Sequence, residues 1–256
     1  MWLLDQYREF VAALRFLSIL PLPGTTHLFD KDAIGERVIV GSVYFPIIGL
    51  LIGLILWLLI FLCSFVAPPL VIAALVVIVE VLLTGGLHLD GLMDSCDGLF
   101  GGKTPERKLE IMRDSRVGSF GVLGAFCLLL LKFVCIASLS RSSLPLALLM
   151  ALPTARWCMV LALHVFPSAR TTGIGAIFRQ AITLQSLVIA AALTLLIVIA
   201  VGRIMGIGIW ILASGITLAL GTWITRQLGG LTGDSYGAVA EIIEVICLLA
   251  FVVLHF

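Results

Sequence analysis

Long apolar stretches separated by short polar segments run along almost the whole chain. A helix needs roughly 20 apolar residues to cross the hydrocarbon core of a bilayer, and segments of about this length recur. They are Val43–Phe65, Leu70–Leu89, Phe120–Leu139, Leu144–Phe166, Ile182–Val201, Ile204–Ile224 and Ala238–Phe256. The pattern predicts an all-α fold: a polytopic transmembrane helix bundle of about seven spans, forming a single integral-membrane domain over residues 1–256.

The first twenty residues follow a different pattern. Charged residues, Arg8 and Arg15 among them, are mixed with apolar residues at helical spacing. A cleaved signal peptide needs an apolar region without such charges. The pattern therefore favours a helix over residues 1–20 that lies in the membrane interface. Pro21 and Pro23 end it, and we expect a polar loop over Gly24–Arg37.

Composition agrees with a membrane protein and excludes several other classes. The chain is 61% hydrophobic and 12% charged, whereas soluble domains are nearer 45–50% apolar and about 25% charged. A soluble enzyme and a disordered chain are therefore excluded. The balance of 16 basic against 15 acidic residues gives no overall field for a polyanion. We expect the lipid bilayer, and no nucleic acid, as a partner.

Basic residues predict the orientation, because cytoplasmic loops are enriched in Lys and Arg. With the N-terminus inside, 12 of the 16 basic residues fall on the cytoplasmic side. This asymmetry predicts an N-in, C-out topology. Two polar segments, 84–118 and 225–237, then lie on the cytoplasmic side, and we expect the chemistry there.

An acidic motif lies in the first of these segments, with the sequence TGGLHLDGLMDSCDG over residues 84–98. Its aspartates at positions i, i+4 and i+7 share one face of a helix: they are Asp90, Asp94 and Asp97. Like charges at this spacing repel, and hard oxygen ligands of this kind suit Mg²⁺ or Mn²⁺. Gly91 and Gly98 would leave room for a bulky ligand. The plainer alternative is a solvated helix end that carries acids.

Basic residues follow the acidic motif. Thr104 is typical of a helix N-cap, with Pro105 at the first helical position. Arg113 and Arg116 are three residues apart and are expected to share a face near the end of this helix. Arginine donates bidentate hydrogen bonds to phosphate, which favours ligand contact. The alternative is that both serve only as positive-inside signals.

The second polar segment adds further acids and glycines. On a helix that enters the membrane, Asp234, Glu241 and Glu244 would share one face. Gly233 is a candidate for substrate binding, because it would let the backbone turn and come close to a ligand. Intramembrane carboxylates are costly and usually functional. Glu241 and Glu244 are candidates for substrate binding, or else they pair with Lys132 or Arg156 inside the bundle.

His88 precedes the first aspartate of the motif by two residues. It is a candidate general base, a metal ligand or a hydrogen-bonded spacer. Two acidic faces, paired arginines and glycine-rich turns at one membrane surface favour phosphoryl transfer from a substrate that contains a pyrophosphate. A bound metal would polarise the phosphoryl oxygens. Such an enzyme typically joins an activated head group to an alcohol.

Four segments resemble the cobalamin synthase family, whose members are also called adenosylcobinamide-GDP ribazoletransferases or cobalamin 5′-phosphate synthases. The segments are 15–23 (RFLSILPLP), 84–98, 111–118 (IMRDSRVG) and 229–234 (GGLTGD). The resemblance implies that adenosylcobinamide-GDP and α-ribazole, or its 5′-phosphate, yield adenosylcobalamin, or its 5′-phosphate, and GMP. It further implies a Mg²⁺-dependent transferase in the cytoplasmic (inner) membrane of a prokaryote, with other enzymes of cobalamin biosynthesis as possible partners.

Roles for the candidate residues follow from this resemblance together with the spacing. Asp90, Asp94 and Asp97 would hold Mg²⁺ on the pyrophosphate. Asp234 would complete the metal site or deprotonate the attacking hydroxyl. Arg113 and Arg116 would bind the GDP phosphates, and His88 would assist proton transfer.

Three other functions share part of this pattern. A CDP-alcohol phosphotransferase also binds metal through a D-G-x-x motif, but needs Ala-Arg where this chain has Asp94-Ser95. A membrane prenyltransferase uses aspartate clusters and Mg²⁺, but would release diphosphate. A cation or corrinoid transporter would place its charges near the midplane of the membrane, whereas here the acids crowd one surface.

Overall fold

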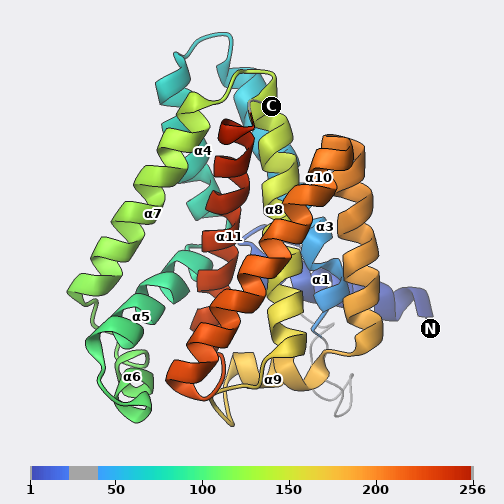
Figure 1. Cartoon of the computed structure of the whole chain (residues 1–256). Coiled ribbons are helices and arrows are strands. Elements are labelled where there is room, and N and C mark those ends of the chain that lie inside the picture. Colours follow the sequence, from blue (N-terminus) through green and yellow to red (C-terminus); the bar gives the residue numbers. More distant parts are fainter. Residues whose placement is uncertain (1, 23–39, 255–256) are drawn as a thin grey trace.

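The computed structural model describes residues 2–22 and 40–254, and its elements are helices (Figure 1). The all-α fold predicted from the sequence is confirmed. The elements are α1 (Trp2–Leu17), η2 (Ser42–Tyr44), α3 (Phe45–Cys63), α4 (Pro69–Leu83), α5 (Leu87–Gly101), α6 (Pro105–Ile111), α7 (Ser119–Ser138), α8 (Ser143–Val165), α9 (Ile174–Ala181), α10 (Leu184–Leu228) and α11 (Gly233–Val253). The predicted loop over Gly24–Arg37 lies outside the described residues.

Five of the helices are long and apolar enough to cross a membrane, and the bent pair α4 and α5 makes a sixth candidate. The chain is therefore a multi-pass membrane protein. The longest helix, α10, breaks at Arg203, whose φ is 52°, and folds back on itself there (Figure 1). Its two arms correspond to the two separate spans predicted on either side of this residue. The count of seven spans and the N-in orientation stay predictions.

The centre of the bundle is α8, which has 89% of its most apolar 18-residue window buried. It is surrounded by α3, α10 and α11. Small residues allow this close approach: a Cβ at Gly49 of α3 would lie 2.7 Å from the carbonyl oxygen of Leu152. A side chain at Gly221 of α10 would likewise collide with the ring of Phe166.

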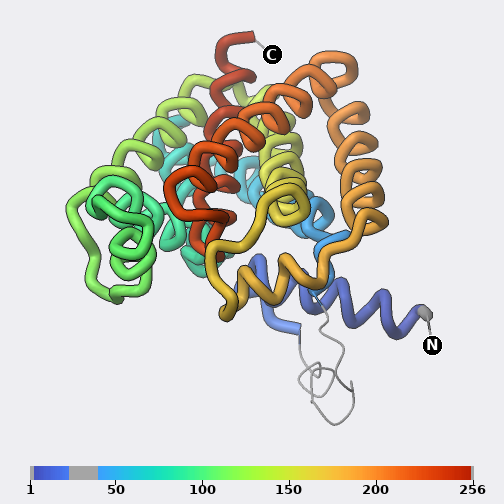
Figure 2. The backbone as a smooth tube through the Cα atoms, turned by 60° about the horizontal axis from the view of Figure 1, so that its bottom comes forward, coloured from blue at the N-terminus to red at the C-terminus, as the bar shows by residue number. Residues whose placement is uncertain are grey.

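The second predicted span, Leu70–Leu89, extends beyond the helix that the structure shows. Helix α4 ends at Leu83, six residues before the predicted end, and the chain then turns by 88° into α5. Gly85 and Gly86 take φ values of 63° and 70° in this turn, a conformation that glycine adopts without a steric cost. Helix α5, with its acidic motif, therefore lies beside α6 at the lower end of the bundle in Figure 1, the end that is turned forward in Figure 2.

Helix α1 runs across the direction of the long helices (Figure 1). Its inner face, with Val11, Leu14 and Leu17, is buried, whereas Leu3 and Tyr7 are exposed. The helix predicted over residues 1–20 is thus present as Trp2–Leu17, whereas its place in the membrane interface stays a prediction. It contributes Phe16 to the site described next.

Candidate active site

The site forms where the first turns of α5 and α11 cross. A Cβ at Gly91 would lie 2.8 Å from the carbonyl oxygen of Asp234, and one at Gly237 would lie 3.1 Å from the Cα of His88. These glycines allow the two helices to touch through their backbones. The space that the sequence assigned to a ligand at Gly91 is therefore partly taken up by α11.

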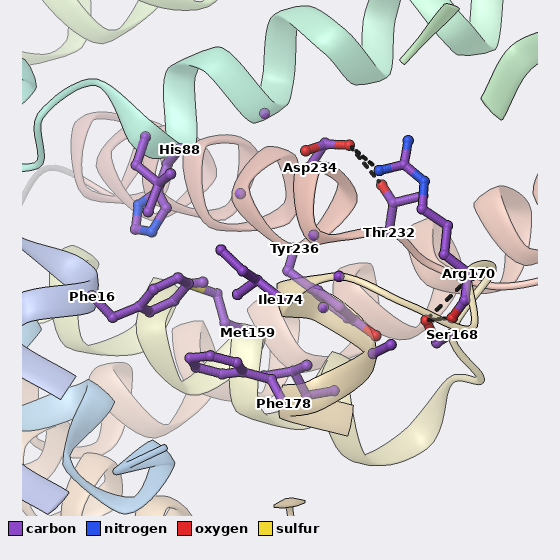
Figure 3. A pocket seen from close by; sticks show the side chains of 18 of the residues that line it. Phe16, His88, Met159, Ser168, Arg170, Ile174, Phe178, Thr232, Asp234 and Tyr236 are labelled. Carbon is purple, nitrogen blue, oxygen red and sulfur yellow. Dashed lines mark hydrogen bonds and ion pairs between the residues drawn. The ribbon is translucent and has the colours of Figure 1, made fainter. Parts of the chain in front are cut away.

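A cavity of about 220 Å³, which we call the α9 cavity, opens beside this crossing. It is bounded by α5, α11, the segment 168–178 that includes the start of α9, and residues of α1 and α8. Figure 3 shows its two ends: Asp234, Arg170 and Thr232 form a polar end, whereas Phe16 and Phe178 line the other. Gly233, predicted to bind substrate, also lines this cavity.

Arg170 reaches the site through a short backbone pairing. The amide of Ala169 donates to the carbonyl of Leu231, and the amide of Leu231 donates to Pro167, both at 2.8 Å. This pairing brings the Arg170 guanidinium to within 3.4 Å of the Asp234 carboxylate. In the sequence, Arg170 was one of the basic residues that predicted the orientation, and it was given no role in the site. Its place in the short polar segment between the spans Leu144–Phe166 and Ile182–Val201, which also contains Arg179, was the available clue.

A second cavity of about 240 Å³, the loop cavity, lies between α5 and residues 112–117. The three aspartates predicted to share a helical face all line it: Asp90, Asp94 and Asp97. Arg113 and Arg116 line the opposite side. Asp90 lines both cavities, so it stands where they meet.

The two arginines differ from prediction in their local structure. Thr104 caps α6, as predicted, by accepting a hydrogen bond from the amide of Arg107 at 3.3 Å. The helix then ends at Ile111, so Arg113 and Arg116 lie in a loop and do not share a helical face. Arg116 is largely exposed and pairs with Asp114 at 2.6 Å. This contact lowers the pKa of Asp114 to about 2.

Asp97 makes contacts that the sequence did not predict. Its two carboxylate oxygens accept hydrogen bonds from the amides of Gly118 and Gly121, each at 2.8 Å. These amides lie at the start of α7, where N–H groups have no acceptor within their own helix. Gly98, one residue on, packs against Lys108 and Met112 of α6. Both residues therefore fix the arrangement of α5, α6 and α7.

Negative charge accumulates around Asp94. Burial is the main cause that raises the pKa of Asp94 to about 6, and the neighbouring carboxylates of Asp90, Asp234 and Asp97 add to it. Within the described part of the chain, no three His, Cys, Asp or Glu side chains converge closely enough to hold a metal ion by themselves. A cation here would need ligands from a substrate or water as well.

Glu241 and Glu244 lie deeper, inside the bundle. The Lys132 ammonium contacts Glu80 and Glu241 at 2.9 Å and Glu244 at 2.8 Å. Arg156 contacts Glu244 at 2.8 Å. Neither Glu241 nor Glu244 lines the α9 cavity or the loop cavity. The pairing with Lys132 and Arg156, which the sequence left as an alternative to substrate binding, is what the structure shows.

His88 lies between the α9 cavity and the buried cluster around Lys132. Its side chain is 2% exposed, lines the α9 cavity, and has no hydrogen-bond partner at either ring nitrogen. The hydroxyl of Tyr236, in the same cavity, also lacks a partner. Unpartnered buried polar atoms are rare in native proteins. The unpartnered atoms of His88 and Tyr236 line a cavity, where a bound ligand would supply their hydrogen-bond partners.

Comparison with known proteins supports the resemblance seen in the sequence. Residues 9–252 match the family described as cobalamin-5-phosphate synthase. The chain belongs to the cobalamin-5-phosphate synthase family. This membership confirms the resemblance and favours it over a CDP-alcohol phosphotransferase, a prenyltransferase or a transporter.

Relatives from this family match along nearly their whole length and bear the name adenosylcobinamide-GDP ribazoletransferase. The protein of Desulfitobacterium hafniense is 42% identical over 97% of this chain and 98% of its own. The protein of a Roseiflexus species is 40% identical over 92% of this chain and 86% of its own. The protein of Citrobacter koseri is 38% identical over 94% of this chain and 98% of its own. No solved structure matches the chain.

Proposed function

We propose that the chain is a transferase that joins adenosylcobinamide-GDP to α-ribazole, or to its 5′-phosphate, with release of GMP. The products are adenosylcobalamin, or its 5′-phosphate, and GMP. The observation that carries the proposal, beyond family membership, is the meeting of two cavities at Asp90. One cavity offers acids opposite arginines, which suits a pyrophosphate, and the other is mainly apolar.

The reaction requires one bond to form and one to break at the same phosphorus. A ribose hydroxyl oxygen attacks the phosphate carried by the cobinamide, and the bond from this phosphorus to the bridging oxygen of the pyrophosphate breaks. GMP leaves with that oxygen, and the hydroxyl proton passes to a carboxylate. Asp234 is placed for this role because it lines the α9 cavity and is held by Arg170.

Arg113 and Arg116 would bind the GDP phosphates from the loop. Both line the same cavity as the acids, and a guanidinium matches a phosphate bidentately. Arg116 would exchange its exposed contact with Asp114 for the substrate. Because exposed ion pairs add little to stability, this exchange costs little.

The donor set near Asp94 fits Mg²⁺, which usually takes one or two carboxylates and completes its shell with phosphate oxygens and water. Asp90 and Asp94 would hold it, because no ion pair of the described residues involves either of them. When bound, it would polarise the phosphoryl oxygens and neutralise charge on the leaving phosphate. Asp97 and Asp234 are engaged by amides and by Arg170, so we assign them other roles.

GMP release from membranes that contain the full-length protein tests this function. Asp94→Asn is expected to raise the Mg²⁺ concentration needed for half-maximal rate at least tenfold. Asp97→Asn, a matched change on the same helical face, should leave that concentration within about twofold. Equal responses of the two variants, or near-wild-type activity of Asp94→Asn at limiting Mg²⁺, would contradict the metal assignment. Absence of GMP formation by the wild type would overturn the function itself.

Other features of the proposal concern the cell. The apolar helices place the protein in a membrane, and its relatives are bacterial. We therefore assign it to the cytoplasmic membrane of a prokaryote, with segments 84–118 and 225–237 on the inner side. Association with other enzymes of cobalamin biosynthesis remains a prediction.

A further inference from the structure

The α9 cavity has two chemically different ends (Figure 3). At one end, Arg170 and Thr232 surround the carboxylate of Asp234. At the other end, the rings of Phe16 and Phe178 approach each other, with centroids 4.5 Å apart. Small-molecule sites commonly combine apolar walls with a few polar groups that fix orientation. A ligand that is polar at one end and aromatic at the other would fit.

His88 lies at the apolar end, apart from Asp234 (Figure 3). Helix α5 places Gly91 opposite Asp234 and His88 opposite Gly237. His88 is thus three residues, or roughly 5 Å along the helix axis, from the level of Asp234. Both ring nitrogens are buried without a partner. A neutral imidazole carries one N–H donor, which needs an acceptor from whatever fills this end of the cavity.

The acceptor substrate of the proposed reaction has matching chemistry. The base of ribazole is an uncharged dimethylbenzimidazole: two fused aromatic rings with two methyl groups. One of its ring nitrogens carries the ribose, and the other is a hydrogen-bond acceptor, so the base has no donor of its own. It therefore needs apolar walls and one N–H or O–H donor. Guanine, in contrast, has several donors and acceptors, which an apolar end lined by phenylalanines would leave unpaired.

We infer that the α9 cavity binds the acceptor nucleoside, with its base against the rings of Phe16 and Phe178 and the free ring nitrogen accepting a hydrogen bond from His88. This inference rests on the proposed function and names the subsite of one of its two substrates. The ribose then points to Asp234, where its hydroxyl is deprotonated. The donor pyrophosphate occupies the loop cavity, and the two substrates meet beside Asp90. His88 is thus a specificity residue rather than the proton-transfer group that its place in the motif suggested.

The inference is tested by removing the acceptor atom from the substrate. The ribonucleoside of dimethylindole has a C–H in place of the free ring nitrogen of α-ribazole. For the purified full-length wild type, we expect kcat/KM to be about tenfold higher with α-ribazole, because a buried hydrogen bond contributes about 1–1.5 kcal/mol. Equal use of the two nucleosides by the wild type would overturn the inference without any variant.

Substitution of His88 extends the test to the protein. His88→Leu should lose this discrimination by losing rate on α-ribazole, with the KM for adenosylcobinamide-GDP unchanged within twofold. His88→Gln, which keeps an N–H donor, should recover part of it. His164→Leu is the matched control, because His164 on α8 lines neither cavity. Discrimination that survives in His88→Leu, or that is lost in Tyr236→Phe instead, would overturn the assignment to His88.

A second variant and a second measurement cover the case in which His88→Leu does not fold. Phe178→Ala should raise the KM for α-ribazole at least fivefold and leave that for adenosylcobinamide-GDP within twofold. GMP should compete with adenosylcobinamide-GDP and not with α-ribazole; the reverse would place the guanine in the α9 cavity and overturn the inference. Equilibrium dialysis of α-ribazole against wild type and Phe178→Ala needs no turnover, so it separates this inference from the proposed function.

Discussion

Lys132 is the cation on which three buried carboxylates depend. Its ammonium contacts Glu80, Glu241 and Glu244 within 2.9 Å, and it is 1% exposed. Arg156 is the second cation of the cluster. Three carboxylates thus share two cations inside a membrane bundle. Lys132→Met keeps the length of the side chain but leaves three acids with one cation.

The expected cost follows from the burial of the group. Removing one partner of a buried ion pair costs about 3–5 kcal/mol, because it leaves an uncompensated buried charge. If each kcal/mol shifts the midpoint by about 2–4 °C, Lys132→Met should unfold about 6–20 °C below the wild type. The double variant that also carries Glu241→Gln should recover part of this loss, since it removes one of the excess charges.

The assay is thermal unfolding of the purified protein in detergent, followed by tryptophan fluorescence. Arg107→Met is the control: Arg107 contacts Glu110 at 2.7 Å, but the side chains are 59% and 69% exposed. Such a pair contributes about 0–1 kcal/mol, so the midpoint should fall by no more than about 4 °C. If Lys132→Met unfolds within 2 °C of the wild type, the reasoning about the buried network is refuted.

Three further perturbations address the crossing of α5 and α11 and the acidic face. Gly91→Ala places a methyl group 2.8 Å from the carbonyl oxygen of Asp234, so α11 must shift. The rate of GMP release should therefore fall at least tenfold. The control Gly208→Ala adds its methyl group in open space and should leave the rate unchanged. Asp97→Ala removes the acceptor for two amides at the start of α7 and should cost about 1–2 kcal/mol in thermal unfolding; unchanged stability would argue against the capping role. Asp94, with its pKa raised to about 6 from an ordinary 3.8, binds a proton more readily in the folded than in the unfolded chain. Its contribution to the stability of the metal-free protein should therefore fall as pH rises from 4 to 6. A midpoint difference between wild type and Asp94→Asn that does not vary over this range would contradict the pKa shift.

The long helices were predictable because the thickness and apolar character of the bilayer determine their length and composition. The predicted spans for α3, α7 and α8 agree with the helices within two residues at each end. The second span was predicted too long because hydropathy does not register the left-handed glycines that turn the chain after α4. The three aspartates on one face of α5 were predictable from spacing, since the period of a helix is fixed.

Contacts between distant segments were not predictable in the same way. Arg170 meets Asp234, 64 residues further on, only because a two-residue backbone pairing aligns their segments. Asp97 has the same spacing signal as Asp90 and Asp94, yet its oxygens bond amides that begin another helix. Periodicity predicts which residues share a face. It does not predict which partner that face meets.

The presence or absence of a built-in cation distinguishes the two groups of acids in this chain. Glu80, Glu241 and Glu244 all contact Lys132 within 2.9 Å, and Glu244 also contacts Arg156, so cations of the fold itself offset most of their charge. No ion pair of the described residues involves Asp90 or Asp94, although their carboxylates repel each other. Both aspartates line an open cavity, so water can screen this repulsion, and in the proposed reaction a cation and a phosphate would take its place. Placing a lysine in this cavity should therefore stabilise the bundle and remove the negative charge that we propose binds the metal, so stability and activity should change in opposite directions at this face.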